Sequence, residues 1–268
     1  MGPWLFGIAV VAALLSAAVV AGSEQPELVM PPDMPRDEAA RLRDLAERAA
    51  VTGRVTTERF RLPANVFEYL LDHPEFAATV ARALRIASYR VWREGTEMWL
   101  DDGQGAVGRF AFVHTVAGSR IVYARGRYTR WMIPIRGDAV AVLTWSSEPS
   151  GDGRMLIAPA LTGFVRLENV VVDAVARLLR RAATSKAEQM ARKLLADFAA
   201  AARMIDAEPG RVLDALRAHP DVAPADLEGF RRLVEPRRGL GYSPRNATVR
   251  PPDRTVASQV TAIAPFTL

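Results

Sequence analysis

Few residues in this chain have side chains that commonly do chemistry. The sequence has three histidines and no cysteine, which excludes thiol nucleophiles, disulfides and cysteine metal sites. His73 and His219 each precede a proline, a context typical of turns and helix caps. His114 lies in a strand-like stretch, where two-residue alternation places it on the side of Phe110 and Phe112. An imidazole there could orient a ligand, and the alternative is a histidine at a sheet end that bonds to backbone or water.

Arginine is the second candidate for a ligand contact. Arg125 and Arg127 share one side of the next strand-like stretch with Ile121 and Tyr123. An arginine at the mouth of a pocket binds a carboxylate or phosphate through two hydrogen bonds, whereas an arginine on the solvent side of an edge strand binds no ligand. The chain contains no GxSxG, HExxH or phosphate-loop motif. We therefore assign no catalytic residue, no metal site and no cofactor from the sequence.

The N-terminus has the composition of an export signal. The first 22 residues contain no charged side chain, and residues 4–21 form a mainly apolar run that ends in small residues. Such a run is either the core of a signal peptide or an N-terminal membrane anchor. Both alternatives predict an exported protein, which is either periplasmic or anchored to the inner membrane.

The composition of the chain limits the classes of partner that it can have. Half of the 268 residues are hydrophobic, which is enough for a sizeable core, and the formal net charge is +5. Outside the cytoplasm a basic surface would meet an anionic membrane surface and not nucleic acid. The alternative is an evenly mixed charged surface without such a partner.

The longest helical pattern covers residues 168–205. Its apolar residues recur at steps of three, four or seven and include Leu178 and Leu194. A stripe this long must pack against another surface, and the preceding part of the chain predicts a sheet. The strand-like stretches there are 88–95, 96–102, 105–118, 119–129, 138–148 and 153–167.

Turn signals separate these stretches at Gly95, Gly103, Gly118 and Gly137. Connections this short join antiparallel neighbours in a meander. The predicted fold class is therefore α+β, with a curved antiparallel sheet wrapped around a long C-terminal helix.

The flanking segments complete the predicted order of elements. Residues 51–63 alternate as a strand, and Asn65 with Glu68 three residues later forms a capping-box pattern at the start of two short helices. We divide the chain into an export segment, a linker with a short helix, the main domain, two short helices and a disordered basic tail. The boundaries are 1–22, 23–53, 54–205, 206–235 and 236–268.

The segment RFRLPANVFEYLLDHPEF at residues 59–76 resembles the first strand and paired helices of the START-like superfamily, which includes polyketide cyclase-type and lipid-transfer proteins. The resemblance covers about residues 54–205 and rests on the order of elements. It implies a helix-grip fold with an apolar cavity between the sheet and the long helix. In relatives this cavity holds lipids, sterols, polyketides or aromatic metabolites. The family has no universal catalytic residues to carry over.

These expectations define a candidate ligand site between the sheet and the long helix. We expect it to be lined by alternating strand side chains and by leucines of the helix. The candidate ligand-binding residues are Phe110, Phe112, His114, Tyr123, Arg125, Leu143, Trp145, Leu178 and Leu194. The alternative is that the apolar members of this set fill a solid core.

The predicted function is that of an exported protein that holds a hydrophobic, lipid-like molecule, for lipid transport or for maintenance of the cell envelope. Binding is favoured over catalysis because no catalytic motif is present. Two alternatives remain. One is a cyclase or hydrolase that uses His114 or a pocket arginine together with Tyr123, and the other is an envelope scaffold protein.

Overall fold

Long alternating stretches in the middle of the chain form one antiparallel sheet. The computed structural model describes residues 26–130, 133–168 and 191–235. Within them the strand order is β1-β8-β7-β6-β5-β4-β3, and β2 pairs with β8 beside β1. The strands are β1 Val51–Thr56, β2 Phe60–Leu62, β3 Arg90–Glu94, β4 Glu97–Asp101, β5 Ala106–Val116, β6 Ser119–Arg130, β7 Ile133–Pro149 and β8 Met155–Glu168. The predicted meander is confirmed, and β1 returns to pair with its last strand.

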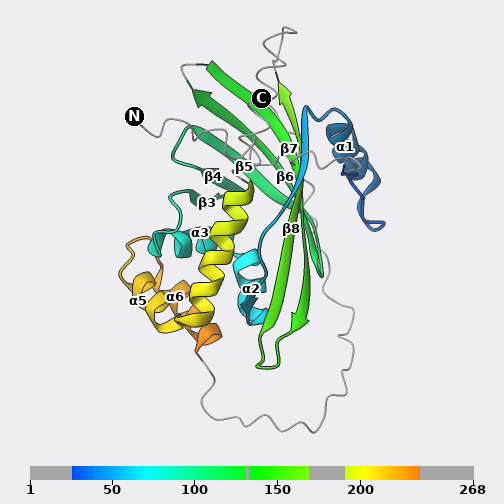
Figure 1. Ribbon diagram of the computed structural model, residues 1–268. Helices are drawn as coiled ribbons and strands as arrows, with labels where there is room; N and C mark the ends of the chain where they lie inside the picture. The colour runs from blue at the N-terminus through cyan, green and yellow to red at the C-terminus, as the bar shows by residue number, and fades with distance from the viewer. Residues whose placement is uncertain (1–25, 131–132, 169–190, 236–268) are drawn as a thin grey trace, which may run out of the picture. The chain divides into compact units, whose positions relative to one another are not determined.

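Helices cover both faces of this sheet (Figure 1). They are α1 Arg36–Glu47, α2 Ala64–Asp72, α3 Pro74–Ala83, a helix at residues 191–207, α5 Pro209–Arg217 and α6 Pro224–Val234. The helix predicted over 168–205 is helical at residues 191–207, and residues 169–190 lie outside the described part of the chain, as does the predicted tail. The predicted α+β class is confirmed.

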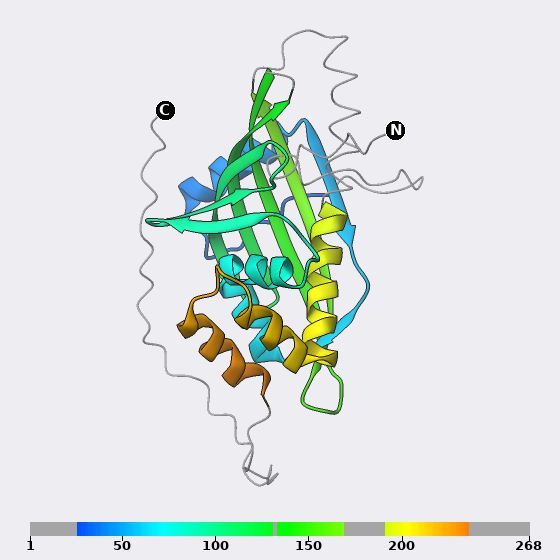
Figure 2. The same ribbon diagram turned by 90° about the vertical axis from the view of Figure 1, so that its left-hand side faces the viewer.

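The two faces of the sheet carry different partners. Helix α1 packs against β7 and β8 on one side, which we call the α1 face. On the other side, which we call the helix face, lie α2, α3 and the helix at residues 191–207, with α5 and α6 packed beneath them (Figure 2). Val55 there contacts Ala191 and Leu195, and Trp145 contacts Phe67 of α2. The helix face is therefore the side on which the sequence predicts a ligand.

One end of the helix face is a solid aromatic core. The rings of Phe60, Phe67 and Phe198 contact one another, with centroids 5.8 to 6.2 Å apart. Phe230 of α6 and Leu216 of α5 are fully buried in the same cluster. The two C-terminal helices thus extend the core of the main domain.

Local details at the start of the domain differ from the prediction. The single strand expected over 51–63 is two strands, because residues 57–59 leave the sheet between β1 and β2. The predicted capping box is wrong. Helix α2 begins one residue before Asn65, and the Pro63 carbonyl accepts the backbone N–H groups of Val66 and Phe67 without any side-chain cap.

Two of the predicted glycine turns illustrate different outcomes. Gly118 connects β5 to β6 with a φ of 80°, a conformation that favours glycine. Gly137 was predicted as a turn and instead pairs with Gly126 and Leu167 inside β7. The reversal between β6 and β7 lies earlier, between Arg130 and Ile133. A glycine inside a sheet gives the same sequence signal as a glycine in a turn.

Candidate functional site

Small side chains occupy the centre of the helix face. Cross-strand pairing places Ala124 beside Ala139, and Val122 beside Ala141, on neighbouring strands. Residues paired across a sheet share one face, so these side chains point to the same side. All three alanines are buried. We call Ala124, Ala139 and Ala141 the alanine floor.

Larger apolar side chains border the alanine floor. Phe110 pairs with Ala124, Phe112 pairs with Val122, and the two rings meet edge to face at 6.1 Å. Leu143 lies on the same face, where it packs in the cluster of Val55. Four of the predicted ligand-site residues are thus on the predicted side. They are Phe110, Phe112, Leu143 and Trp145.

Of the two leucines predicted on the long helix, Leu194 is within the described residues. Leu194 is half-buried, whereas its neighbour Leu195 makes the contact with Val55. Leu178 lies outside the described residues.

The placement predicted for His114 is wrong. The register of β5 against β6 shifts between Phe112 and His114, so that Val113 is an extra residue and His114 pairs with Ile121. Such a bulge turns the following side chain to the other face. His114 therefore lies on the α1 face, with its Nε2 3.7 Å from a carboxylate oxygen of Asp33.

The placement predicted for Tyr123 and Arg125 is also wrong. Tyr123 pairs with Ala111, which alternates with Phe110 and Phe112, so Tyr123 and Arg125 point to the α1 face. The Arg41 guanidinium of α1 lies over the Tyr123 ring, 4.4 Å from its centroid. Alternation relates residues within one strand, but only the register between strands decides which faces coincide.

A buried polar network occupies the α1 face. The Tyr123 hydroxyl donates a 2.9 Å hydrogen bond to Asp138, whose side chain is 1% exposed. Arg166 donates to the second Asp138 oxygen at 2.7 Å. Burial, followed by the Asp138 charge and the hydrogen bond to it, raises the pKa of Tyr123 to about 12. Because Arg166 also forms an ion pair with Asp44, the network holds α1 against the sheet.

Sequence reasoning missed an arginine that lies on the helix face beside Phe112. Arg120 pairs with Leu143, and its side chain is only 4% exposed. It forms ion pairs of 3.1 and 2.8 Å with Glu68 and Asp72 of α2. Its guanidinium also lies 5.6 Å from the Phe112 ring centroid. The period-two pattern of β6 contained this signal, since Arg120 alternates in phase with Val122 and Ala124.

The groups proposed for an enzyme lie outside the predicted pocket. His114, Tyr123 and Arg125 are all on the α1 face, opposite the alanine floor. Across residues 26–130, 133–168 and 191–235, no three His, Cys, Asp or Glu side chains are grouped as metal ligands. None of the helices in these ranges is long and apolar enough to cross a membrane.

The antiparallel sheet carries α2, α3 and the helix at residues 191–207 on its helix face and α1 on the opposite face, which is the α+β class that the sequence predicted. No protein-family model matches the chain, and no curated protein sequence matches it. One similar solved structure is the Zhui aromatase/cyclase from a Streptomyces species, with 12% identity over 59% of this chain and 98% of that chain and a TM-score of 0.31. Another is a hypothetical protein from Helicobacter pylori, with 10% identity over 68% of this chain and 100% of that chain and a TM-score of 0.35. Similarities of this size say nothing about ligand or activity.

Proposed function

We propose that this protein binds a hydrophobic, lipid-like molecule over the alanine floor. The supporting observation is the contrast between the two ends of the helix face. One end is filled by Phe60, Phe67, Trp145 and neighbouring rings, whereas the centre carries alanines. Protein interiors are close-packed, so a row of small side chains on one wall leaves depth that another group must fill.

Phe112 and Arg120 give this site its chemical character. The Phe112 and Phe110 rings offer apolar contact area at the border of the floor, and the charge of Arg120 is already balanced by two carboxylates. Affinity would therefore come from apolar burial. A ligand that buries roughly 300 Å² gains about 7 kcal/mol at 25 cal/mol per Å², before the cost of its immobilisation.

The proposal is tested by replacing an alanine of the alanine floor with a large side chain. Ala141→Phe adds a ring at its centre, and Ala40→Phe makes the same change at an exposed position of α1. If the floor faces a ligand site, Ala141→Phe stays folded with little loss of stability and no longer co-purifies with ligand. If the floor is part of a solid core, overpacking lowers the free energy of unfolding by about 1–3 kcal/mol or more, and the proposal fails.

The ligand is identified by native mass spectrometry of the full chain, expressed in a host with membranes, followed by organic extraction. A stoichiometric adduct in the unchanged protein and in Ala40→Phe, but not in Ala141→Phe, is the expected result. A bare mass on folded, unchanged protein counts against the proposal.

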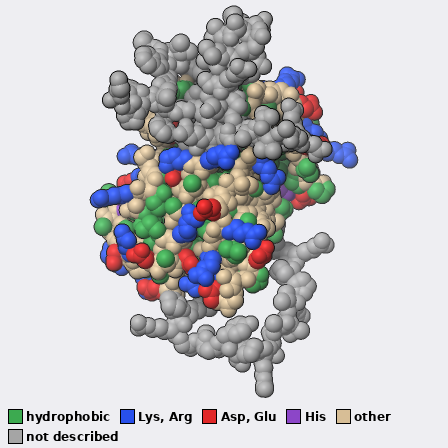
Figure 3. Space-filling view, viewed as in Figure 1, with side chains coloured by type: hydrophobic (Ala, Val, Ile, Leu, Met, Phe, Trp, Pro, Cys, Tyr) green, Lys and Arg blue, Asp and Glu red, His purple; other side chains and the backbone are tan. Residues whose placement is uncertain are grey.

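We propose an extracytoplasmic setting, because the first 22 residues carry no charge and residues 4–21 are mainly apolar. Recovery of the protein in the cytoplasmic fraction after cell fractionation would contradict it. Binding to an anionic membrane surface stays a prediction from the sequence. On the face drawn in Figure 3, basic and acidic side chains of the described residues are interspersed, without a large patch of one sign.

A further inference from the structure

A second hollow lies on the helix side of the molecule, at the edge of the sheet. It has a volume of about 510 Å³ and runs between α3, the edge strand β3 and the start of α6. We call it the β3–α3 groove. The lining residues that matter here are Glu75, Thr79, Arg82, Arg90, Trp92 and Asp221. None of them belongs to the alanine floor, so this site is independent of the function proposed above.

Two residues that line the groove each have a buried polar atom without a hydrogen-bond partner within the described residues. These atoms are Oε2 of Glu75 and Nε of Arg82. The two residues are seven apart on α3, so they share one face of the helix about 10 Å apart along its axis. Thr79 lies between them. A buried acceptor and a buried donor each cost free energy when unpaired, which makes both atoms sites for ligand groups.

The remaining polar atoms of these two side chains contact other residues of the protein. Arg82 donates to Asp221 at 2.6 Å and to the Thr79 hydroxyl at 2.9 Å. The other carboxylate oxygen of Glu75 lies 3.8 Å from an Arg93 nitrogen. The orientation of the Arg82 Nε–H is therefore set by the protein before any ligand binds.

The strand side of the groove adds a cation. Arg90 has no hydrogen bond and no ion pair within 4 Å among the described residues, and after the hydrogen bond from Arg82 its charge helps to lower the pKa of Asp221. Trp92 pairs with Trp99 and stacks on it, so its ring lies on the face opposite to Val91 and α3. The guanidinium of Arg90 is therefore the group of this strand that suits an anionic part of a ligand.

Groups of both charges line the groove. Glu75, Asp101, Asp221 and Asp226 are acidic, and Arg82, Arg90 and Arg93 are basic. A ligand with only negative charge would face four carboxylates, and a ligand with only positive charge would face three guanidinium groups. The mixture favours a ligand that carries one charge of each sign.

We propose that the β3–α3 groove binds a small zwitterion, with its ammonium group on Glu75 Oε2 and its carboxylate or phosphate on Arg82 Nε and Arg90. The volume is within the range of small-ligand sites. A free metabolite or an ethanolamine lipid headgroup offers the same chemistry, and the experiment separates the two.

The probes are phosphoethanolamine and the dipeptide glycylglycine, titrated into the full chain by calorimetry. Phosphocholine has the same charges as phosphoethanolamine but no ammonium N–H, and ethanolamine and inorganic phosphate carry one charge sign each. We expect at least one zwitterionic probe to bind about tenfold or more tightly than these controls, since each charged hydrogen bond contributes strongly. If neither probe exceeds all three controls, the proposal is overturned.

Two variants locate the binding. Glu75→Gln and Arg90→Gln should each weaken the better probe about tenfold or more, while Glu47→Gln and Arg43→Gln, at exposed positions of α1, leave it unchanged. Thermal unfolding checks that all four variants fold. Unchanged affinity in folded Glu75→Gln would place the ligand elsewhere and refute the proposal.

Vesicles separate the two sources of the ligand. If the protein binds vesicles that contain phosphatidylethanolamine more tightly than pure phosphatidylcholine vesicles, and Glu75→Gln removes this difference, the ligand is a lipid headgroup. Binding of the soluble probes alone assigns a free metabolite.

Discussion

Phe112 and His114 are two residues apart on one strand, yet they point to opposite faces of the sheet. The bulge between them inserts Val113 without a partner and moves His114 to the α1 face. Phe112 stays on the helix face beside Phe110 and Arg120. The bulge therefore separates the two residues that alternation had grouped into one ligand site.

This separation predicts opposite effects of two substitutions. Phe112→Arg places a charge at the border of the alanine floor and should abolish co-purification of a hydrophobic ligand, because burying an unpaired charge is costly. His114→Ala should leave the amount of ligand per protein unchanged. Lipid extraction from both purified variants measures the effect, with thermal unfolding as the check on folding. Ligand loss in folded His114→Ala would mean that the site extends to the α1 face.

Tyr123 predicts a stability change at alkaline pH. Burial and the Asp138 charge raise its pKa from 10.0 to about 12. A raised pKa stabilises the fold fully below pH 10, and this contribution is lost as the pH rises towards 12. The advantage of the unchanged protein over Tyr123→Phe, about 2 kcal/mol below pH 10, should therefore shrink over this interval. Urea unfolding of both proteins as a function of pH measures it, and a constant difference would exclude the shift.

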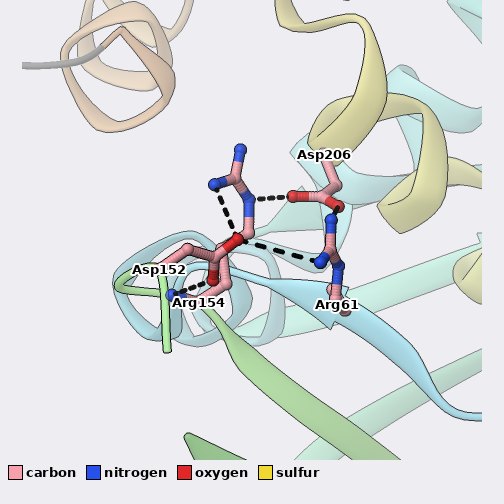
Figure 4. A network of polar contacts seen from close by, with 4 residues as sticks. All are labelled: Arg61, Asp152, Arg154 and Asp206. Carbon is pink, nitrogen blue, oxygen red and sulfur yellow. Dashed lines mark hydrogen bonds and ion pairs between the residues drawn. The ribbon is translucent and has the colours of Figure 1, made fainter. Parts of the chain in front are cut away.

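Asp206 connects the hairpin between β7 and β8 to the helix at residues 191–207 (Figure 4). It accepts hydrogen bonds from Arg154 and Arg61, and its side chain is 11% exposed. Asp206→Asn should lower the free energy of unfolding by about 1.5–3 kcal/mol, because Arg154 and Arg61 both lose the negatively charged acceptor that they share.

Asp152 is the control for this network. It contacts the same two arginines but is 40% exposed, so Asp152→Asn should cost less than about 1 kcal/mol. Urea unfolding measures both variants. Equal losses would show that burial does not set the contribution of these ion pairs.

Gly108 marks a close approach of two strands. A Cβ atom there would lie 2.9 Å from the Arg125 carbonyl oxygen and 3.0 Å from the Gly126 Cα. Both are backbone atoms and cannot move aside separately, so Gly108→Ala should destabilise the protein by about 1–3 kcal/mol. Gly210→Ala in α5 meets nothing within 4 Å and should be neutral or stabilise by up to about 1 kcal/mol. The midpoints of thermal unfolding should shift in opposite directions or by clearly different amounts.

The order of the elements and their type could be predicted from local pattern. Alternation over residues 88–167 identified the strands of the meander, and the turn at Gly118 was located because its conformation favours glycine. The side shared by Phe110 and Phe112 followed from alternation within one strand. These features depend on neighbours in the sequence, so the sequence alone determined them.

The composition of the site was decided by tertiary structure. Register between β5 and β6 placed Arg120 on the helix face and Tyr123 on the α1 face, and a single unpaired residue moved His114. Gly137 lies inside β7 because two neighbouring strands pair with it. Register and bulges depend on hydrogen bonds between segments far apart in the chain. Alternation within one strand contains no information about them.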